Sequence, residues 1–290
     1  MKGKFTVVDG HVHTFSSDDV SEKIINSFNK MYDIEFTNPG TGTIEDVLQN
    51  MNKTGIDYTI MANFAPAKII HKNNSWSLEV GKKYESLVPL VSFHPDMEEP
   101  MDILVEEYIK NGAKGIKLHP MAQCFDPNDD RLEKVYKISG EAAFPIVFHC
   151  GRVSNARLNN YSDIDMILPV IKKYPKIPFV LTHMVDGNIG DVFKLADMYE
   201  NVYFDTSIVI TGYPPLLEVN EPSWQDNEVV EYVINKVGAD RLLFGSDYPW
   251  GSPEHDLNRF LEMKIEDCQK SMILAENAIK LFKITNGAKN

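Results

Sequence analysis

The amino-acid sequence predicts a closed (β/α)8 barrel of the TIM type, and three observations support this prediction. Eight short apolar segments alternate with helical patterns along the chain, which favours parallel strands joined by right-handed crossovers. Several of these segments are apolar throughout, as expected for strands that are buried on both faces. The length of 290 residues suits one such barrel, in which each repeat takes roughly thirty residues.

A doubly wound open sheet is the alternative architecture. That fold usually carries a Gly-x-Gly-x-x-Gly turn after its first strand, where a dinucleotide binds. No such motif follows the apolar run from Phe5 to Val8, and neither a linker nor a low-complexity segment interrupts the chain. We therefore expect residues 1–290 to form one barrel domain.

The elements of the first half follow from apolar runs and capping residues. Predicted strands cover residues 5–13, 56–62, 87–93 and 113–118. The polar segment 14–42 is interpreted as a long loop with one helix near 22–31, and long loops in compact domains tend to be functional. Helices are expected over 43–52, 76–86 and 101–110. Thr43 and Asp46 predict an imperfect capping box at the start of the first, and Gly55 predicts its end.

The second half continues the same alternation. Strands are expected over residues 145–148, 178–181, 202–205 and 241–244. The expected helices cover residues 129–142, 163–174, 190–199, 228–237 and much of the chain after 254, with an amphipathic stretch over 275–282. A proline-rich loop is expected over residues 211–222.

Polar residues with metal-binding chemistry gather where the predicted strands end. Six of the eight histidines lie there, and in a (β/α)8 barrel the carboxyl ends of the strands form the rim that carries the active site. The residues in question are His11, His13, His94, Lys117, His119, His149, His183 and Asp247. Although a His-x-His pair alone is a weak signal, side chains two apart share one face of a strand. This gathering predicts a metal site at the rim.

Coordination chemistry suggests which of these residues bind the ion. Zinc takes neutral imidazole and carboxylate ligands, and a catalytic site keeps one position for water. His11, His13, His149 and Asp247 would supply three nitrogens and one oxygen to a single zinc ion. Asp247 would also accept a proton from the bound water as general base, and His183 would orient that water or protonate a leaving group.

The remaining rim residues have structural as well as functional interpretations. His94 and His119 each precede a proline, and such a pair can be a turn that ends a strand. We expect Lys117 to face the site, and we assign Lys117, His119 and Arg152 to substrate binding. Arg152 is suited to holding a substrate carboxylate through paired hydrogen bonds, whereas the structural alternative is a salt bridge to an acidic neighbour such as Asp186.

Composition limits the classes of partner and compartment. The formal net charge of −13 argues against nucleic acid or an anionic membrane as the main partner. The three cysteines, Cys124, Cys150 and Cys268, form neither a disulfide framework nor a Cys-x-x-Cys zinc site. No apolar run resembles a signal peptide or a membrane span. We expect a cytoplasmic protein that binds a small carboxylated molecule, with a homodimer as a further possibility.

Five motifs at the predicted strand ends occur in order along nearly the whole chain. The motifs are Asp9-Gly10-His11-Val12-His13, Gly115-Ile116-Lys117-Leu118-His119-Pro120, Pro145-Ile146-Val147-Phe148-His149, Leu181-Thr182-His183 and Leu243-Phe244-Gly245-Ser246-Asp247-Tyr248-Pro249. Together they resemble the amidohydrolase superfamily, and the resemblance is greatest to the branch that includes the aminocarboxymuconate semialdehyde decarboxylases. The run from Ile273 to Ala278 also resembles the C-terminal helix of that branch.

The resemblance implies a metal-dependent barrel, usually with zinc. It matches His11, His13, His149 and Asp247 to metal ligands. It matches His183 to a histidine that is catalytic in the decarboxylases and binds a second metal in binuclear relatives.

Two features depart from the decarboxylase pattern. Lys117 stands where some binuclear members carry a carboxylated, metal-bridging lysine, which the decarboxylase lacks. Residues 184–187 also differ from the glycine-rich run usual in the branch. One zinc is therefore the principal expectation, and a second metal is the alternative.

The motifs do not separate two reactions. We expect a metal-activated water to hydrolyse an amide, lactone or ester of a small carboxylated molecule. The alternative is non-oxidative decarboxylation of an unsaturated or aromatic acid, since both reactions use the same metal and the same Asp-His pair. A non-catalytic binding barrel would be expected to lack a ligand, and none is missing.

Overall fold

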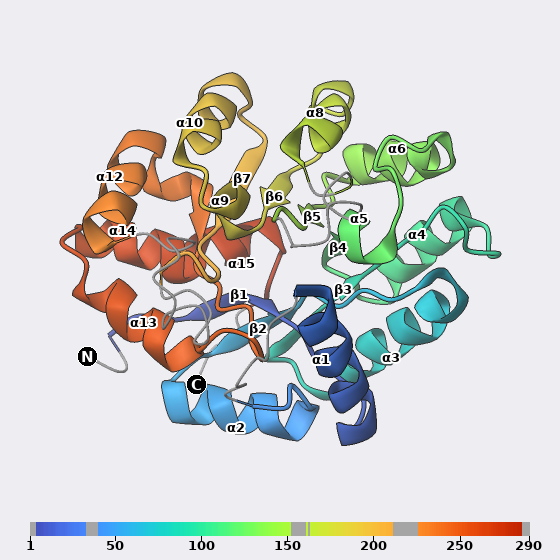
Figure 1. Cartoon of the computed structure of the whole chain (residues 1–290), viewed down its shortest axis with the longest axis horizontal. Helices are drawn as coiled ribbons and strands as arrows, with labels where there is room; N and C mark the ends of the chain where they lie inside the picture. The colour runs from blue at the N-terminus through green and yellow to red at the C-terminus, as the bar shows by residue number, and fades with distance from the viewer. Residues whose placement is uncertain (1–3, 33–39, 152–160, 162, 211–225, 286–290) are drawn as a thin grey trace.

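The computed structural model describes residues 4–32, 40–151, 161, 163–210 and 226–285. Eight strands pair in parallel in the order of the chain, with helices arranged around them (Figure 1). The strands are β1 (Val8–Val12), β2 (Tyr58–Met61), β3 (Leu87–Val91), β4 (Gly115–Leu118), β5 (Ile146–Phe148), β6 (Phe179–Leu181), β7 (Val202–Asp205) and β8 (Leu242–Leu243). Each strand lies inside its predicted range, and the predicted (β/α)8 barrel is confirmed.

Hydrogen bonds between β1 and the segment around β8 bring the two edges of the sheet together. The amide of Gly10 donates to the carbonyl of Phe244 at 2.8 Å, and the amide of Asp247 donates to the carbonyl of His11 at 2.9 Å. Residues from the two ends of the chain therefore become neighbours at one rim.

The helices of the described part of the chain lie close to their predicted ranges, with a few differences. They are α1 (Asp18–Tyr32), α2 (Ile44–Thr54), α3 (Ile70–Lys83), α4 (Met101–Lys110), α5 (Pro120–Gln123), α6 (Glu133–Ala142), α8 (Ile164–Lys173), α9 (His183–Asp186), α10 (Ile189–Met198), α12 (Asn227–Val237), α13 (Pro253–Glu262), α14 (Asp267–Ser271) and α15 (Asn277–Leu281). Short 3-10 turns cover η1 (Ala67–Ile69), η2 (Asp130–Leu132) and η3 (Ala239–Arg241), and a π-helical turn covers η4 (Met272–Glu276).

Helix α3 begins earlier than predicted, because residues 71–75 after the buried Ile70 are polar and lack the apolar periodicity that marks the rest. The short helices α5 and α9 were not predicted. The proline-rich loop 211–222 lies outside the described residues. Across the part of the chain that the structure describes, no helix combines the length and the apolar character needed to cross a membrane.

Helix α2 shows how local sequence fixes an element beside the rim. It starts directly after Thr43, and Gly55, with φ at 82°, ends it in the left-handed conformation that glycine adopts without strain. The expected capping box is wrong, since Thr43 makes no capping hydrogen bond through its side chain. The carboxylate of Asp46 instead accepts from two amides of the preceding turn and from the hydroxyl of Tyr248, which ties α2 to the segment after β8.

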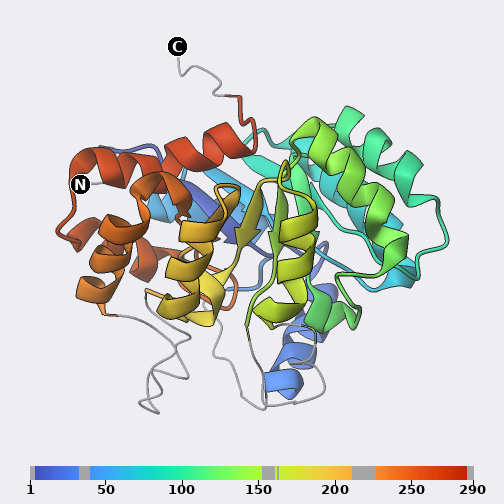
Figure 2. The same ribbon diagram turned by 90° about the horizontal axis from the view of Figure 1, so that it is seen from above.

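Alternation of side chains along the strands separates two hydrophobic clusters. Ile116 and Leu118 belong to the outer cluster, between strands and helices. Val8 and Val147 belong to the inner cluster, which fills the barrel together with Phe282, just after α15. Helix α15 lies on the opposite side of the strands from α1 (Figure 2). The apolar filling therefore occupies the α15 end, and the inward positions at the other rim are left to polar residues.

An irregularity in β1 places both of its histidines on the inner side. Val8 faces the inner cluster, whereas Val12 belongs to the outer one, although residues four apart normally share a face. The register between β1 and β2 shifts between Asp9 and Val12, as in a β-bulge, which re-aims side chains. His11 and His13 flank Val12 and both reach the carboxylate of Asp247.

Candidate metal centre

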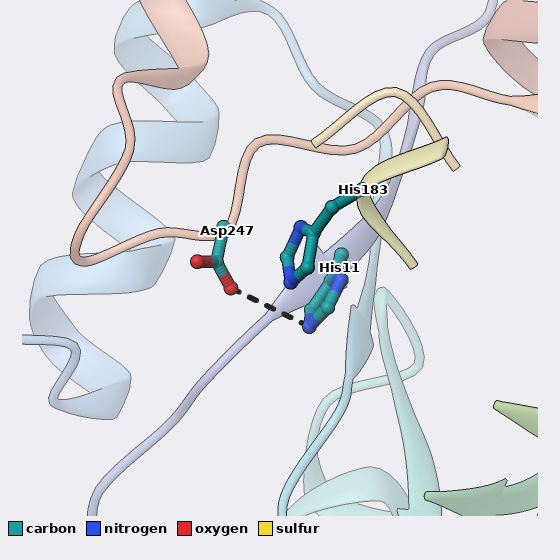
Figure 3. A group of neighbouring side chains, drawn as sticks. All are labelled: His11, His183 and Asp247. Atoms are coloured by element: carbon teal, nitrogen blue, oxygen red, sulfur yellow. Dashed lines mark ion pairs between the residues drawn. The ribbon is translucent and has the colours of Figure 1, made fainter. Parts of the chain in front are cut away.

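Three buried side chains from distant parts of the chain converge at the rim. They are His11 in β1, His183 after β6 and Asp247 after β8, and their potential ligand atoms all lie within 4.8 Å of one another. Figure 3 shows the two imidazole rings side by side and the carboxylate directed toward them. The Nε2 atom of His11 lies 3.4 Å from Oδ1 of Asp247. Two imidazoles and a carboxylate at these separations can hold a metal ion.

His13 adds another nitrogen to this group. Its Nε2 lies 3.2 Å from Oδ1 of Asp247, and its ring centroid is 5.1 Å from that of His11. Asp247 thus lies within contact of both strand-one histidines.

Asp205, at the end of β7, fixes the orientation of His11. Its Oδ2 lies 2.9 Å from Nδ1 of His11, and both side chains are fully buried. An ionised carboxylate can only accept a hydrogen bond, so Nδ1 carries the proton and Nε2 presents its lone pair toward Asp247. This arrangement holds the imidazole in the tautomer that a metal ion requires.

Ser207 connects the two histidines of the group to Asp205. Its hydroxyl lies 2.8 Å from Nδ1 of His183 and 3.2 Å from Nδ1 of His11, and it donates a short hydrogen bond to Asp205. Since that proton goes to the carboxylate, the hydroxyl oxygen accepts from His183. His183 therefore also presents Nε2 as its free nitrogen.

Burial and charge set the protonation states. Burial, with a contribution from Lys117, lowers the pKa of His11 to about 4, and burial also lowers the pKa of His13. Burial alone would raise the pKa of Asp247, but the hydrogen bond from His13 and the neighbouring histidines hold it well below its ordinary value. Neutral imidazoles and an ionised carboxylate are the forms that bind metal ions.

Lys117 enters the same site from β4. It is fully buried, and its Nζ lies 3.2 Å from Nε2 of His11, the nitrogen that would bind an ion. Burial lowers the pKa of Lys117 to about 8, although Asp205 and Asp247 oppose this shift. The lysine therefore faces the site.

His149 and His119 form a stacked pair on the neighbouring strands. Their ring centroids are 3.7 Å apart, and the ring of His149 meets that of His183 edge-on at 5.1 Å. Nδ1 of His119 accepts from the amide of Ala122 and so caps α5. Nε2 of His149 is buried and has no hydrogen-bond partner within the described structure. Such an orphaned nitrogen is costly unless an ion or a ligand engages it.

Two further residues singled out in the sequence stand apart from this group. Both ring nitrogens of His94 bind the backbone, through the carbonyl of Gln123 at 2.9 Å and the amide of Asp96 at 3.0 Å. This supports the structural interpretation of His94 as part of a turn. Arg152 lies outside the described residues.

The segment after β6 adopts an unusual backbone. His183, Met184, Val185 and Asp186 all have φ between 44° and 58°, a left-handed conformation that is costly for residues other than glycine. The sequence here departs from the glycine-rich run of the related branch, so the strain falls on side-chain-bearing residues. Backbone strain of this kind gathers at functional sites, where surrounding contacts hold it in place.

Sequence reasoning missed Asp205 and Ser207. Asp205 is the last residue of a correctly predicted strand, so the rule that selected the histidines also applies to it. Its role was not visible because its partner, His11, lies 194 residues away.

A cavity of about 460 Å³ adjoins the group at His13 and Trp250. It lies between α1 and the segment that links β2 to α3. Its wall is mostly apolar and includes the aromatic side chains of Phe28, Phe64 and Trp76. The ring centroids of Phe28 and Trp250 are 4.6 Å apart. Its volume lies within the usual range for small-molecule sites, and a mostly apolar lining is typical of such sites.

Comparisons with known proteins support the fold and the family. A family model described as Amidohydrolase matches residues 8–284. The search of curated proteins gave no match.

Solved structures with the same fold share little sequence identity with this chain. An uncharacterised TIM-barrel protein of Bordetella bronchiseptica is 18% identical, with a TM-score of 0.74 over 96% of this chain and 99% of that one. 5-Carboxyvanillate decarboxylase of Novosphingobium aromaticivorans, complexed with manganese and 4-hydroxy-3-methoxy-5-nitrobenzoic acid, is 14% identical, with a TM-score of 0.70 over 97% and 96%. A candidate 2-pyrone-4,6-dicarboxylic acid hydrolase of Pseudomonas putida is 17% identical, with a TM-score of 0.68 over 97% and 98%.

Proposed function

The chain belongs to the amidohydrolase family, and from this premise we propose that it is a metal-dependent enzyme that breaks a bond in a small carboxylated molecule. His11, His13, His149 and Asp247 are the proposed ligands. The observation that carries the proposal is the orphaned, buried Nε2 of His149, whose ring meets that of His183 at the edge of the compact group. A nitrogen in that position is explained by an ion that it binds.

Zinc is the proposed ion, with one per chain. Three imidazole nitrogens and one carboxylate oxygen form a donor set that zinc accepts. Manganese is the competing ion, since 5-carboxyvanillate decarboxylase was crystallised with it. A second ion beside Lys117 is the binuclear alternative.

The protein groups around the ion have separate roles in this proposal. When bound, the ion supplies a Lewis acid that polarises the reacting carboxylate or carbonyl group. Asp205 holds His11 in its ligand tautomer, and Ser207 holds His183 by its Nδ1 atom. The free Nε2 of His183 can then move a proton to or from the substrate. Lys117, with His119 and Arg152, is assigned to the substrate carboxylate.

Non-oxidative decarboxylation of an aromatic or unsaturated acid is the reaction that the site supports best. The aromatic cavity next to His13 suits a flat apolar ring rather than a polar amide. In this reaction the bond between the ring carbon and its carboxylate breaks, and the electron pair stays on the carbon. Nε2 of His183 relays a proton from solvent to that carbon, and carbon dioxide leaves.

Hydrolysis of an amide, lactone or ester is the second candidate, and the buried Lys117 favours it. A lysine at this position is the feature that departs from the decarboxylase pattern and resembles the binuclear members of the superfamily. Here Asp247 would accept the proton of the attacking water, and His183 would protonate the leaving group.

A substrate panel separates the two reactions. The chain, loaded with Zn²⁺ or Mn²⁺, is assayed with aromatic and unsaturated carboxylic acids for carbon dioxide release, and with lactones, esters and amides for acid release. The proposal predicts carbon dioxide release, which His183→Asn abolishes and His255→Asn, at an exposed helical position, leaves unchanged. Acid release alone would favour hydrolysis, and turnover that survives both His183→Asn and Asp247→Asn would contradict the proposed site.

A further inference from the structure

The cavity beside the metal centre differs from the rest of the protein in charge. The chain has 42 acidic and 29 basic side chains, yet the described residues that line the cavity include two lysines and no Asp or Glu. Lys23 comes from α1 and Lys72 from α3, so two separate elements bring positive charge to one space. Neither lysine forms an ion pair within the part of the chain that the structure describes.

Unsatisfied hydrogen-bond donors line the same cavity. Trp250 is only 3% exposed, and its indole Nε1–H has no acceptor among the described residues. The Nδ2 group of Asn73, which is next to Lys72 in α3, also lacks a partner. Both groups are donors, and an indole nitrogen cannot accept. Buried donors without acceptors are unfavourable, so their presence in a cavity points to a ligand that brings oxygen atoms.

The apolar walls of the cavity indicate that the ligand also has an apolar body. Phe28 packs against Trp250 at 4.6 Å and faces Phe64 at 6.4 Å between ring centroids. Trp76 adds a further aromatic surface, and His13 places one end of the cavity at the metal centre. An apolar body between these rings would bring a distal group to the lysines and its reacting end to the metal.

We infer that this cavity is a subsite for a second anionic group of the substrate, remote from the group that reacts. The preferred ligand has an apolar body and carries a carboxylate, sulfonate or phosphate that faces Lys23 and Lys72 and accepts from Trp250. The assignment of the reacting end rests on the proposed function. Binding of the anion itself depends only on the cavity and is tested without catalysis.

Two fluorescent probes separate the anion from the apolar body. 8-Anilinonaphthalene-1-sulfonate carries a sulfonate, and N-phenyl-1-naphthylamine is its uncharged analogue. Each is titrated into the metal-loaded chain and into the Lys23→Ala/Lys72→Ala, Trp250→Phe and Phe28→Ala variants. A matched control, Lys30→Ala/Lys68→Ala, removes two exposed lysines from α1 and η1 that do not line the cavity.

The inference predicts that the double Lys23/Lys72 variant binds the sulfonate about tenfold more weakly and binds the uncharged probe as the parent does. Trp250→Phe weakens binding of the sulfonate probe by less than the double lysine change does. Phe28→Ala weakens binding of both probes. The control variant matches the parent, and salt weakens only the sulfonate. Failure of either probe to bind, or equal effects of the lysine changes on both probes, overturns the inference. Metal content and carbon dioxide release are measured separately, so a wrong reaction leaves this result intact.

Discussion

The side-chain nitrogens that orient the metal centre are hydrogen-bonded, whereas two side-chain donors at the adjacent cavity lack a partner among the described residues. In the centre, Nδ1 of His11 and of His183 is held by Asp205 or Ser207, and each ring can present its other nitrogen to an ion. In the cavity, the donors of Trp250 and Asn73 have no partner among the described residues.

The difference indicates how each region works. A metal ion needs ligands fixed in advance, because small displacements of the first ligands are expensive. A substrate brings its own hydrogen-bond acceptors, so donors in the apolar wall of the cavity can remain unpaired until it binds. We therefore expect changes in the centre to remove metal and changes in the cavity to leave metal content intact.

The largest expected effect is the loss of metal in Asp247→Asn. This change removes the negative charge that His11 and His13 contact. Loss of an outer hydrogen-bond partner alone lowers metal affinity by about 10–100-fold, so a direct ligand should cost more than about 100-fold. Metal content after dialysis against a chelator buffer measures the effect, with exposed Asp130→Asn and cavity variant Phe28→Ala as controls. Full occupancy in Asp247→Asn would show that the ion lies elsewhere.

A second effect concerns stability and its dependence on pH. Burial lowers the pKa of Lys117 from 10.5 to about 8, a shift worth about 3 kcal/mol. Between these two values the unfolded chain binds the proton that the folded chain has lost, so stability rises with pH there. Below pH 8 the lysine is charged in both states and its burial cost is fully present.

Comparison of the metal-free chain with Lys117→Met isolates this contribution. The variant should be more stable below pH 8, and its advantage should shrink as pH rises toward 10.5. Denaturant unfolding at a series of pH values gives the difference in free energy. A difference that does not change with pH would mean that Lys117 is not buried as a charged group.

A smaller effect is expected for Asp205→Asn, which acts on the centre through His11. The amide keeps the size of the side chain but can donate to Nδ1, which favours the wrong tautomer of the ring. Zinc affinity should fall by about 10–100-fold. Ser207→Ala should lower zinc affinity less, because its hydroxyl is shared between His11 and His183 and the contact between Asp205 and His11 remains. Competition with a zinc-binding dye measures both. Unchanged affinity in Asp205→Asn would remove its orienting role.

Much of this architecture follows from local patterns. Apolar runs located every strand, and Gly55 ended α2 as expected. Residues at strand ends, such as His11 and Asp247, were predictable because parallel strands bring their carboxyl ends to one rim.

The features that could not be predicted from the sequence depend on contacts between distant segments. The left-handed turn from His183 to Asp186 carries no glycine, so no local signal predicts it. The cavity is formed where α1 meets the loop after β2 and Trp250. Its unpaired donors become visible only when those three segments are placed together.

Metal content of His149→Ala and His183→Ala is the most direct test of the proposed centre. His183 lies within the compact group with His11 and Asp247, whereas His149 has the orphaned buried nitrogen. In the proposed centre His149 is a metal ligand and His183 transfers the proton. His149→Ala is therefore expected to bind no zinc, while His183→Ala keeps one zinc per chain and loses turnover, with His255→Ala as control. Full zinc in His149→Ala, together with loss of zinc in His183→Ala, would contradict the proposed centre.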